Sequence, residues 1–347
     1  MKRDLTGKPG LLKEINIGLI KEALYKNGQA TRVELSSITK ISQPTVNLLI
    51  KELLADETIV SLGAMESTGG RRAERYALNH KKSAIALVVI TKDAFELTVV
   101  DMELSPETSS CFLRTEDLSY TEQLTQCLQQ MIVQYPNISA IAVGVPGAVT
   151  ENGEVFAIPQ IPEWEHLSLK DLLEERLQIP VIVSNDINSI TVGYLASQEQ
   201  VQNLVYIHME GNGIGAGIII DGKLYPGRGS FAGELGYMKL GERNAEEILA
   251  SAFHKETHER NRETITLLSQ ILVNVICIAN PEKILLGSKI LKEWVPQIHE
   301  LCQHSLPPYV IPPIDSMEQD KTYYFTGLGK LGLELLIQDI QIIRRHV

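Results

Sequence analysis

The first eighty residues contain apolar side chains at helical spacing, followed by a stretch in which apolar and polar side chains alternate. Apolar positions three and four apart predict a helix over residues 11–26. Thr31 and Glu34 form a T-x-x-E capping box, which predicts the start of a second, short helix. Ser42 predicts the N-cap of a third helix, and Pro44 fits the first turn of that helix because no N–H donor is needed there.

The alternating stretch, residues 58–79, predicts two strands joined by a turn at residues 67–70. Two short capped helices followed by such a hairpin are typical of a winged helix-turn-helix DNA-binding domain. The helix spacing by itself also fits a three-helix interaction module. The order of the elements together with the basic hairpin favours the DNA-binding interpretation.

The predicted DNA-contacting side chains lie on the third helix and on the hairpin. Gln43, Thr45 and Asn47, near the start of the third helix, would face the major groove. Arg71 and Arg72, beside the Gly-Gly pair of the hairpin turn, would reach phosphates or the minor groove.

From residue 83 onward, strands alternate with helices. The pattern predicts paired strands over 84–90 and 95–104, a helix over 120–135, a buried strand over 138–149, a helix and strand over 168–188, and a hairpin over 203–225. The remainder is predicted to be mostly helical. This order is typical of an α/β protein with two lobes, in which ligands lie at the carboxyl ends of strands and between the lobes. We therefore expect two domains, residues 1–82 and 83–347.

The charge is distributed unevenly between these two parts. Residues 1–82 carry 14 Lys and Arg against 9 Asp and Glu, a net charge of +5, whereas the rest of the chain carries −16. A basic head on an acidic body indicates that only the head binds an anionic partner, although short basic segments also arise by chance. The four cysteines form no C-x-x-C pair and the first twenty residues contain no apolar core, which favours a reduced, cytoplasmic protein without a membrane partner.

Gly211 to Gly227 reads GNGIGAGIIIDGKLYPG. Glycines at this spacing let backbone N–H groups approach a phosphate closely. A hairpin between two strands without any ligand uses the same residues. The loop alone leaves both interpretations open.

Four ordered motifs make the body recognisable: AVGVPGAV, IPQIPEW before PVIVSNDINS, GNGIGAGIIIDGKLYPGRGSFAGELGYM, and IANPEKILLGSKI. From residue 83 to the end the chain resembles the ROK family (repressors, open reading frames and sugar kinases). The resemblance implies a two-lobed actin- and hexokinase-like (ribonuclease H-like) body. The head resembles that of the repressor branch, which has a winged helix-turn-helix domain.

The chain departs from the family pattern in two places. The D-x-G-G-T phosphate loop of the kinases falls on residues 89–93, where Val89 replaces the Asp, Thr91 and Lys92 replace the glycines, and Asp93 replaces the Thr. Side chains there block a close backbone approach, and Asp93 would repel phosphate. At the zinc site, Tyr237 stands where the family has His, and the cysteine cluster is absent, so we expect no zinc.

The resemblance implies a sugar site built from amides and carboxylates, which suit vicinal hydroxyls. Asp186 matches the catalytic base of the kinases. The implied sugar-binding residues are Asn185, Asp186, Glu234, Tyr237 and Glu247. Glu246 competes with Glu247, and Tyr237 would either stack on a sugar or pack in the core.

These features predict a sugar-responsive transcriptional regulator, most simply a repressor, with a catalytically silent body and no cofactor. A homodimer on a palindromic operator follows from the need for two heads. Two alternatives stay open: a DNA-binding protein that still phosphorylates a sugar, and a regulator that responds to a protein partner instead of a sugar.

Overall fold

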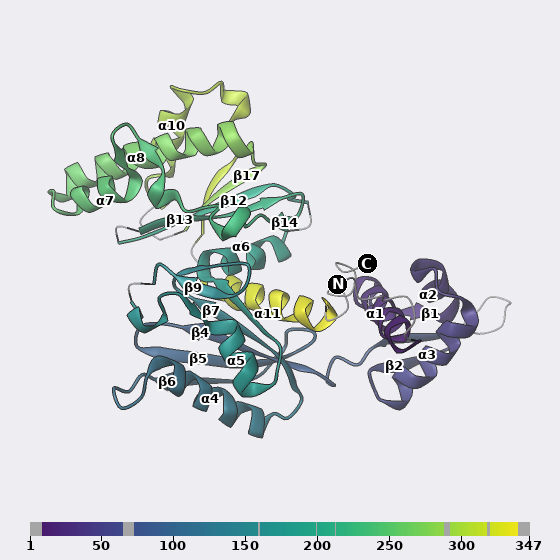
Figure 1. Cartoon of the computed structure of the whole chain (residues 1–347). Coiled ribbons are helices and arrows are strands. Elements are labelled where there is room, and N and C mark those ends of the chain that lie inside the picture. The colour runs from purple at the N-terminus through teal and green to yellow at the C-terminus, as the bar shows by residue number, and fades with distance from the viewer. Residues whose placement is uncertain are drawn as a thin grey trace, which may run out of the picture.

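The computed structural model describes residues 9–64, 73–158, 160–198, 200–211, 213–287, 292–317 and 320–338. A small head, residues 9–78, lies to one side of a two-lobed body, residues 84–338 (Figure 1). Each lobe of the body is built on a five-stranded sheet. This architecture confirms the predicted fold class, an α/β body with two lobes that follows a winged helix-turn-helix unit.

The elements of the head follow the predicted order. They are α1 (Pro9–Asn27), β1 (Ala30–Thr31), α2 (Arg32–Thr39), α3 (Gln43–Ala55), β2 (Ile59–Ala64) and β3 (Glu74–Leu78). Both predicted caps are present: Thr31 and Glu34 form a reciprocal capping box, and Ser42 accepts the N–H of Thr45 at 3.4 Å. The short strand β1 was not predicted, and it pairs with β3 to give the sheet order β1-β3-β2.

The first lobe has the strand order β11-β7-β4-β5-β6, with β4, β7 and β11 parallel. Its elements are β4 (Ala84–Ile90), β5 (Ala94–Asp101), β6 (Pro106–Leu113), α4 (Tyr120–Gln134), β7 (Ile138–Val145), β8 (Ala148–Val149), β9 (Glu154–Phe156), β10 (Leu167–Ser168), α5 (Leu169–Leu177) and β11 (Val181–Asn185). Alternate residues of β4 pack against α4 and against α11 (Asp320–Gln338). Burial on both faces explains why β4 is an unbroken apolar run.

The second lobe has the strand order β14-β13-β12-β17-β18. Its elements are β12 (Leu204–Glu210), β13 (Gly213–Ile220), β14 (Lys223–Leu224), β15 (Lys239–Leu240), β16 (Arg243–Asn244), α7 (Ala245–Phe253), α8 (Thr257–Ala279), β17 (Lys283–Gly287), α10 (Val295–Gln303) and β18 (Ile314–Met317). The predicted hairpin is confirmed as β12 and β13. The expectation of a mostly helical C-terminal part missed β17 and β18, because short buried apolar runs have no diagnostic period.

Helix α8 is the one helix, within the part of the chain that the structure describes, long and apolar enough to cross a membrane by length and composition. It packs in the core of the second lobe, where Leu268, Ile271 and Leu272 are fully buried against β12 and β17.

Two helices lie between the sheets of the two lobes, α6 (Asp186–Ala196) and α11 (Figure 1). Their backbones touch at two glycines. A Cβ atom on Gly193 would lie 1.8 Å from the carbonyl oxygen of Tyr323, and one on Gly327 would lie 1.8 Å from that of Ser189. Only glycine fits at both positions, so the helices cannot tolerate a side chain where they cross.

We expect Gly193→Ala to destabilise the body by about 1–3 kcal/mol, because the new methyl group must push α11 away from α6. Gly10→Ala is the matched control, since nothing lies within 4 Å of its added Cβ atom. That change should leave stability unchanged or raise it by up to about 1 kcal/mol. Urea unfolding of both variants measures the difference, and equal midpoints would contradict the close helix contact.

Candidate functional site

The predicted residues Asn185 and Asp186 lie where β11 ends and α6 begins. Asn185 is the N-cap of α6, and its Oδ1 accepts the N–H of Asn188 at 3.1 Å. Its Nδ2 donates to the carbonyl oxygen of Gly147 at 2.9 Å, which ties the turn after β7 to α6. The amide of Asn185 therefore has two backbone partners already, which leaves one N–H of Nδ2 and one lone pair of Oδ1 for a sugar.

Asp186 opens the first turn of α6, and its Oδ1 accepts the N–H of Ile187 at 2.7 Å. Burial raises the pKa of Asp186 to about 6, and this effect exceeds the opposing effects of the Ile187 N–H and of His208. Glu210 also raises this pKa. His208 and Glu210 belong to β12, so the carboxyl group of Asp186 faces the second lobe.

Glu234 reaches the same place from the second lobe. Burial raises its pKa, and the charge of Asp186 raises it further. The turn that carries Glu234 is held by Gly233, whose carbonyl oxygen accepts the N–H of Ala216 at 2.8 Å. A Cβ atom on Gly233 would lie 1.9 Å from the carbonyl oxygen of Ala216, and its φ of +94° also requires glycine. The structure thus brings Asp186 and Glu234 together as an acid pair.

Tyr324 of α11 lies beneath this acid pair. Its ring packs against Gly144 at the end of β7, and its hydroxyl is buried without a hydrogen-bond partner among the described residues. Burial, and then the charge of Asp186, hold the pKa of Tyr324 well above its usual value. Sequence reasoning missed this residue, because nothing in a tyrosine on a C-terminal helix indicates contact with a distant strand end.

The remaining predicted sugar residues are Tyr237 and Glu247. The ring of Tyr237 is 59% exposed and lies 5.3 Å from that of Phe231, so it does not pack in the core. Glu247 completes the capping box of α7 by accepting the N–H of Asn244 at 2.8 Å. This cap uses one carboxylate oxygen, and sugar binding by Glu247 stays a prediction. Glu246 instead lies beside Gly236, next to the acid pair's turn.

Residues 89–93, where the kinases of the family have a phosphate loop, form a closed turn. Val89 is buried in β4, and the hydroxyl of Thr91 both accepts the N–H of Ala94 and donates to its carbonyl oxygen at 3.1 Å. The carbonyl oxygen of Lys92 accepts the hydroxyl of Tyr120 at 2.8 Å. The turn is closed by Thr91, through its hydroxyl and through the bond from its N–H to the carbonyl oxygen of Ala94.

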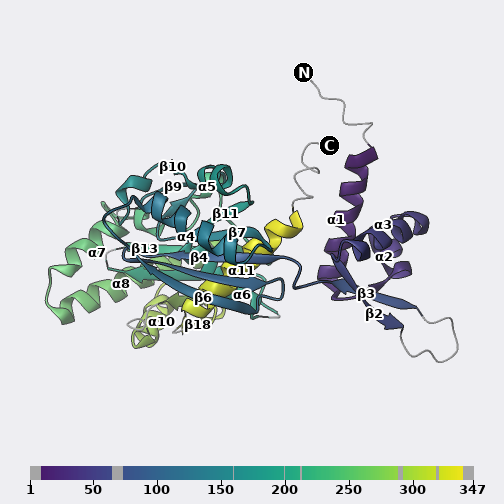
Figure 2. The same ribbon diagram turned by 90° about the horizontal axis from the view of Figure 1, so that it is seen from below.

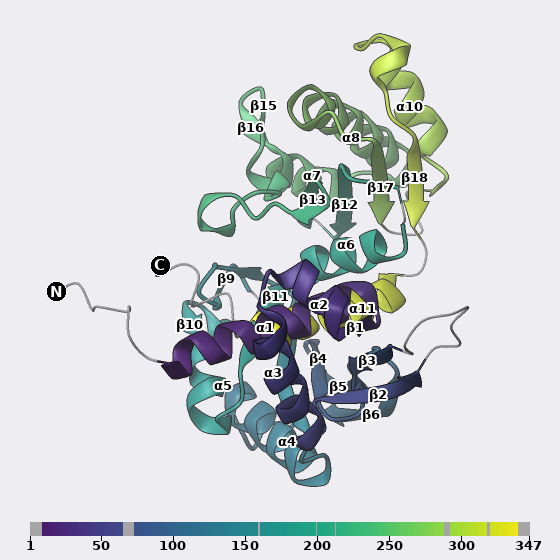
Figure 3. The same cartoon turned by 90° about the vertical axis from the view of Figure 1, so that its right-hand side faces the viewer.

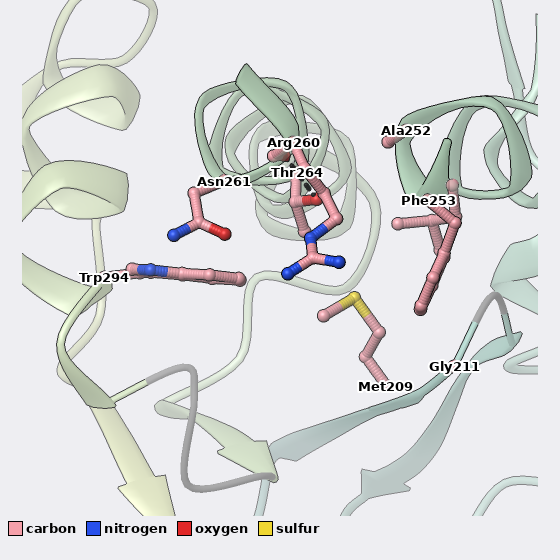
Figure 4. Close-up of a pocket in the computed structure, with 9 residues that line it drawn as sticks. Met209, Gly211, Ala252, Phe253, Arg260, Asn261, Thr264 and Trp294 are labelled. Carbon is pink, nitrogen blue, oxygen red and sulfur yellow. Dashed lines mark hydrogen bonds between the residues drawn. The ribbon is translucent and has the colours of Figure 1, made fainter. Parts of the chain in front are cut away.

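Beside Gly211 the second lobe contains a cavity of about 160 Å³. Figure 4 shows Arg260, Asn261, Trp294 and Met209 around it. Its volume is smaller than the range of about 300–1,000 Å³ that is usual for small-molecule sites. Asn212, the middle residue of the Gly-Asn-Gly loop, lies outside the described residues.

The segment that follows the acid pair's turn forms the hairpin of β15 and β16, in which Lys239 donates to the carbonyl oxygen of Glu242 at 2.9 Å. In the described ranges, no three His, Cys, Asp or Glu side chains converge as metal ligands would.

In the head, α3 buries Val46 and Ile50 and exposes Gln43 and Asn47. The hydroxyl of Thr45 lies 2.8 Å from that of Ser42, so it takes part in the helix cap. Arg71 and Arg72, the predicted wing residues, lie outside the described residues.

Arg32, which sequence reasoning did not single out, connects the hairpin to α3. Its Nε donates to the hydroxyl of Tyr76 at 2.9 Å, and its Nη1 donates to Oδ1 of Asn47 at 3.5 Å. Tyr76 in turn bonds to Glu74. The signal that could have found Arg32 is its place directly after the cap Thr31, at the end of α2 that meets the sheet.

The two-lobed body, with an acid pair at the strand ends, has a hexokinase-like fold and follows a winged helix-turn-helix head. Residues 88–248 match the model of the ROK family. It is 27% identical over 244 residues to the xylose repressor of Caldicellulosiruptor bescii and 26% identical over 255 residues to the transcriptional dual regulator NagC of Escherichia coli. These matches cover 67% and 68% of this chain and 61% of each relative, so the chain spans about three fifths of the length of these curated relatives.

Solved structures share the fold. The crystal structure of a ROK family transcriptional regulator, a homolog of the E. coli MLC protein, matches with a TM-score of 0.71 and 18% identity, over 96% of this chain and 100% of that one. The ROK hexokinase from Thermus thermophilus matches with a TM-score of 0.61 and 16% identity, over 74% of this chain and 99% of that one. The first match includes the head, and the second corresponds in extent to a body alone.

Asp186 should make stability depend on pH. Because burial raises its folded-state pKa above the unfolded value, folding is favoured when it is protonated, and the free energy of unfolding falls as pH rises from about 4 to about 6. Asp186→Asn should therefore exceed the wild type in stability by roughly 1–3 kcal/mol at pH 8, with the gap closing at pH 4.

Urea unfolding at both pH values measures this gap. Glu151→Gln, at an exposed carboxylate of the same lobe, controls for the loss of one negative charge. A constant difference between Asp186→Asn and the wild type at pH 4 and pH 8 would show that Asp186 is not held in a water-poor site.

Proposed function

We propose that this protein is a DNA-binding transcriptional regulator of carbohydrate metabolism that acts as a repressor. In this proposal residues 1–82 bind DNA, and residues 83–347 bind a sugar or sugar derivative without phosphorylating it. The observation that carries the proposal is the acid pair, Asp186 and Glu234, which stands beside a phosphate-loop position that is closed by side chains. The names of two relatives, a xylose repressor and an N-acetylglucosamine repressor, agree with a sugar effector.

The acid pair suits a neutral ligand with several hydroxyl groups. Two half-buried carboxylates repel each other, and hydroxyl donors from one ligand would stabilise both. The exposed ring of Tyr237 can stack on the apolar face of a sugar, and Asn185 can accept one further hydrogen bond. Glu247 would contribute the carboxylate oxygen that does not cap α7.

Phosphoryl transfer needs groups that hold the phosphates and a metal ion. Val89 is apolar and buried where such a group would stand, and Lys92 and Asp93 occupy the turn that a phosphate would enter. The one observation that favours a retained sugar kinase is Asp186, because a carboxyl group with a pKa near 6 suits a general base. If no phosphate is bound beside it, that base cannot take part in phosphoryl transfer.

The proposed DNA-binding head presents Gln43 and Asn47 on α3, and Arg32 holds the hairpin against that helix. We further propose a cytoplasmic homodimer on a palindromic operator, since two heads gain affinity and must match a half-site spacing of about 34 Å or a multiple. A sugar could then act only by binding one arrangement of the lobes better than another.

The proposal is tested by titrating the full chain on an operator selected in vitro from random duplexes, with D-xylose, N-acetylglucosamine and glucose as probes. One sugar should change DNA affinity in the wild type. Asp186→Asn should shift the midpoint of that response at least tenfold, because it loses a charge-assisted hydrogen bond of about 1.5–3 kcal/mol. Glu151→Gln should respond like the wild type.

Three outcomes would contradict parts of the proposal. A wild-type midpoint in Asp186→Asn would place the sugar elsewhere. Sustained ADP release with ATP-Mg and a sugar, lost in Asp186→Asn, would establish the kinase. The absence of any sugar effect on DNA binding would favour control by a protein partner.

The head should separate base recognition from phosphate binding. Asn47→Ala should relax sequence preference, whereas Arg71→Ala with Arg72→Ala should weaken binding to all sequences and reduce the salt slope by about 0.9 for each phosphate that is no longer neutralised. Lys223→Ala with Lys239→Ala, in the body, controls for the removal of two positive charges. An unchanged slope in the double arginine variant would exclude the wing from phosphate binding.

A further inference from the structure

The head and the body meet in a packed joint. Tyr25 of α1 and Met102 of the turn after β5 each pack both against the core of the head and against the layer formed by the first sheet and α11. The N–H of Met102 donates to the carbonyl oxygen of His80 at 3.1 Å. Figures 2 and 3 show the C-terminal end of α11 beside α1. The joint is therefore built from side chains of both units.

A cavity of about 300 Å³ lies in this joint, which reaches the size range of small-molecule sites. Its lining comes from the head, the connecting segment, the first lobe and α11. Apolar walls are formed by Leu78, Met102, Pro180 and Leu336. This cavity shares no residue with the acid pair, so it is separate from the site described above.

The charged side chains that line the cavity are both lysines. Lys21 comes from α1 and Lys82 from the connecting segment, and no carboxylate lines the cavity among the described residues. Lys82 has an ion pair with Asp56, at 3.9 Å and near the surface. Lys21 has no ion pair within the described part of the chain. Two lysines and no carboxylate in one lining favour an anion as the occupant.

We propose that this cavity binds a small amphipathic organic anion, a carboxylate with a short apolar chain. The carboxylate would bond to the ammonium groups of Lys21 and Lys82, and the chain would cover Met102 and Leu336. Thr58, Asn79, Ser83 and Ser139 add neutral polar groups to the lining, beside the two lysines.

Such a ligand would join α1 to the first lobe and to α11, and so would hold the head in one orientation. The effect on DNA binding rests on the proposed function, whereas binding itself does not. The anion would then be a second input to the regulator, independent of the acid pair.

Isothermal titration of the full chain with sodium octanoate tests the proposal, with n-octanol and inorganic phosphate as the uncharged and the purely ionic probes. We expect one octanoate for each chain, and at least tenfold weaker binding of the other two. Lys21→Gln with Lys82→Gln should weaken octanoate at least tenfold. Lys26→Gln with Lys81→Gln, on the same two segments outside the cavity, is the matched control. Ser139→Leu, which fills the cavity without removing a charge, should also weaken octanoate at least tenfold.

No binding of octanoate, equal binding by the two double-lysine variants, or equal binding of octanol would each overturn the proposal. These results come from a titration without DNA, so they stand whether or not the protein regulates transcription. Octanoate could bind as expected but leave DNA affinity unchanged at saturation. That result would support the binding site and would show that binding in the joint does not change how the head binds DNA.

Discussion

Two helix backbones touch at the centre of the body, and the arrangement of the molecule depends on that contact. Gly193 and Gly327 let α6 and α11 cross without side chains between them. Helix α6 begins at Asp186, and α11 ends beside the head. Because the contact is made by backbone atoms, neither helix can slide along the other without breaking it. The contact thus fixes the relative positions of three parts of the molecule: the strand ends of the first lobe, the sheet of the second lobe and the joint with the head.

The acid pair is held in place by the elements around the crossing of α6 and α11. Asp186 is fixed to α6 by the N–H of Ile187, and Glu234 sits on a turn that is tied to β13 through Gly233. Neither carboxyl group has a cationic partner strong enough to cancel the cost of burial, and the charge of Asp186 makes ionisation of Glu234 harder still. A site of this kind gains most from a ligand that brings hydrogen-bond donors and no negative charge. The chemistry of a polyol meets that requirement.

Local signals in the sequence were sufficient for much of the fold. The caps at Thr31 and Ser42 depend on residues three positions apart, and such short-range rules need no knowledge of the tertiary structure. Strand β4 was evident from its apolar run. Strands β17 and β18 were missed because a short buried segment has the same composition in a helix and in a strand.

The site was harder to predict because it joins distant parts of the chain. The motifs that resemble the ROK family indicated Asp186 and Glu234, and the structure brings these two residues together. The motifs could not separate Glu246 from Glu247, since only the start of α7 decides which of the two caps the helix. In the sequence, Gly327 only lowers the helix propensity of its segment. Its role is evident only once the carbonyl oxygen of Ser189 is known to lie against it. Tyr324 and Arg32 act through partners more than forty residues away, and no local pattern reports such contacts.

The head projects from one side of the body (Figure 2), and this shape has a consequence for how the molecule meets a polyanion. The basic charge is collected at one end and the acidic charge at the other, so the protein has a large electric dipole along its length. The field of a nucleic acid exerts a torque on such a dipole before any atoms touch, and turns the basic end forward. The acidic body is repelled at the same time. Encounters would therefore be pre-oriented at low ionic strength, and this orienting effect would fade once the screening length falls below the length of the molecule.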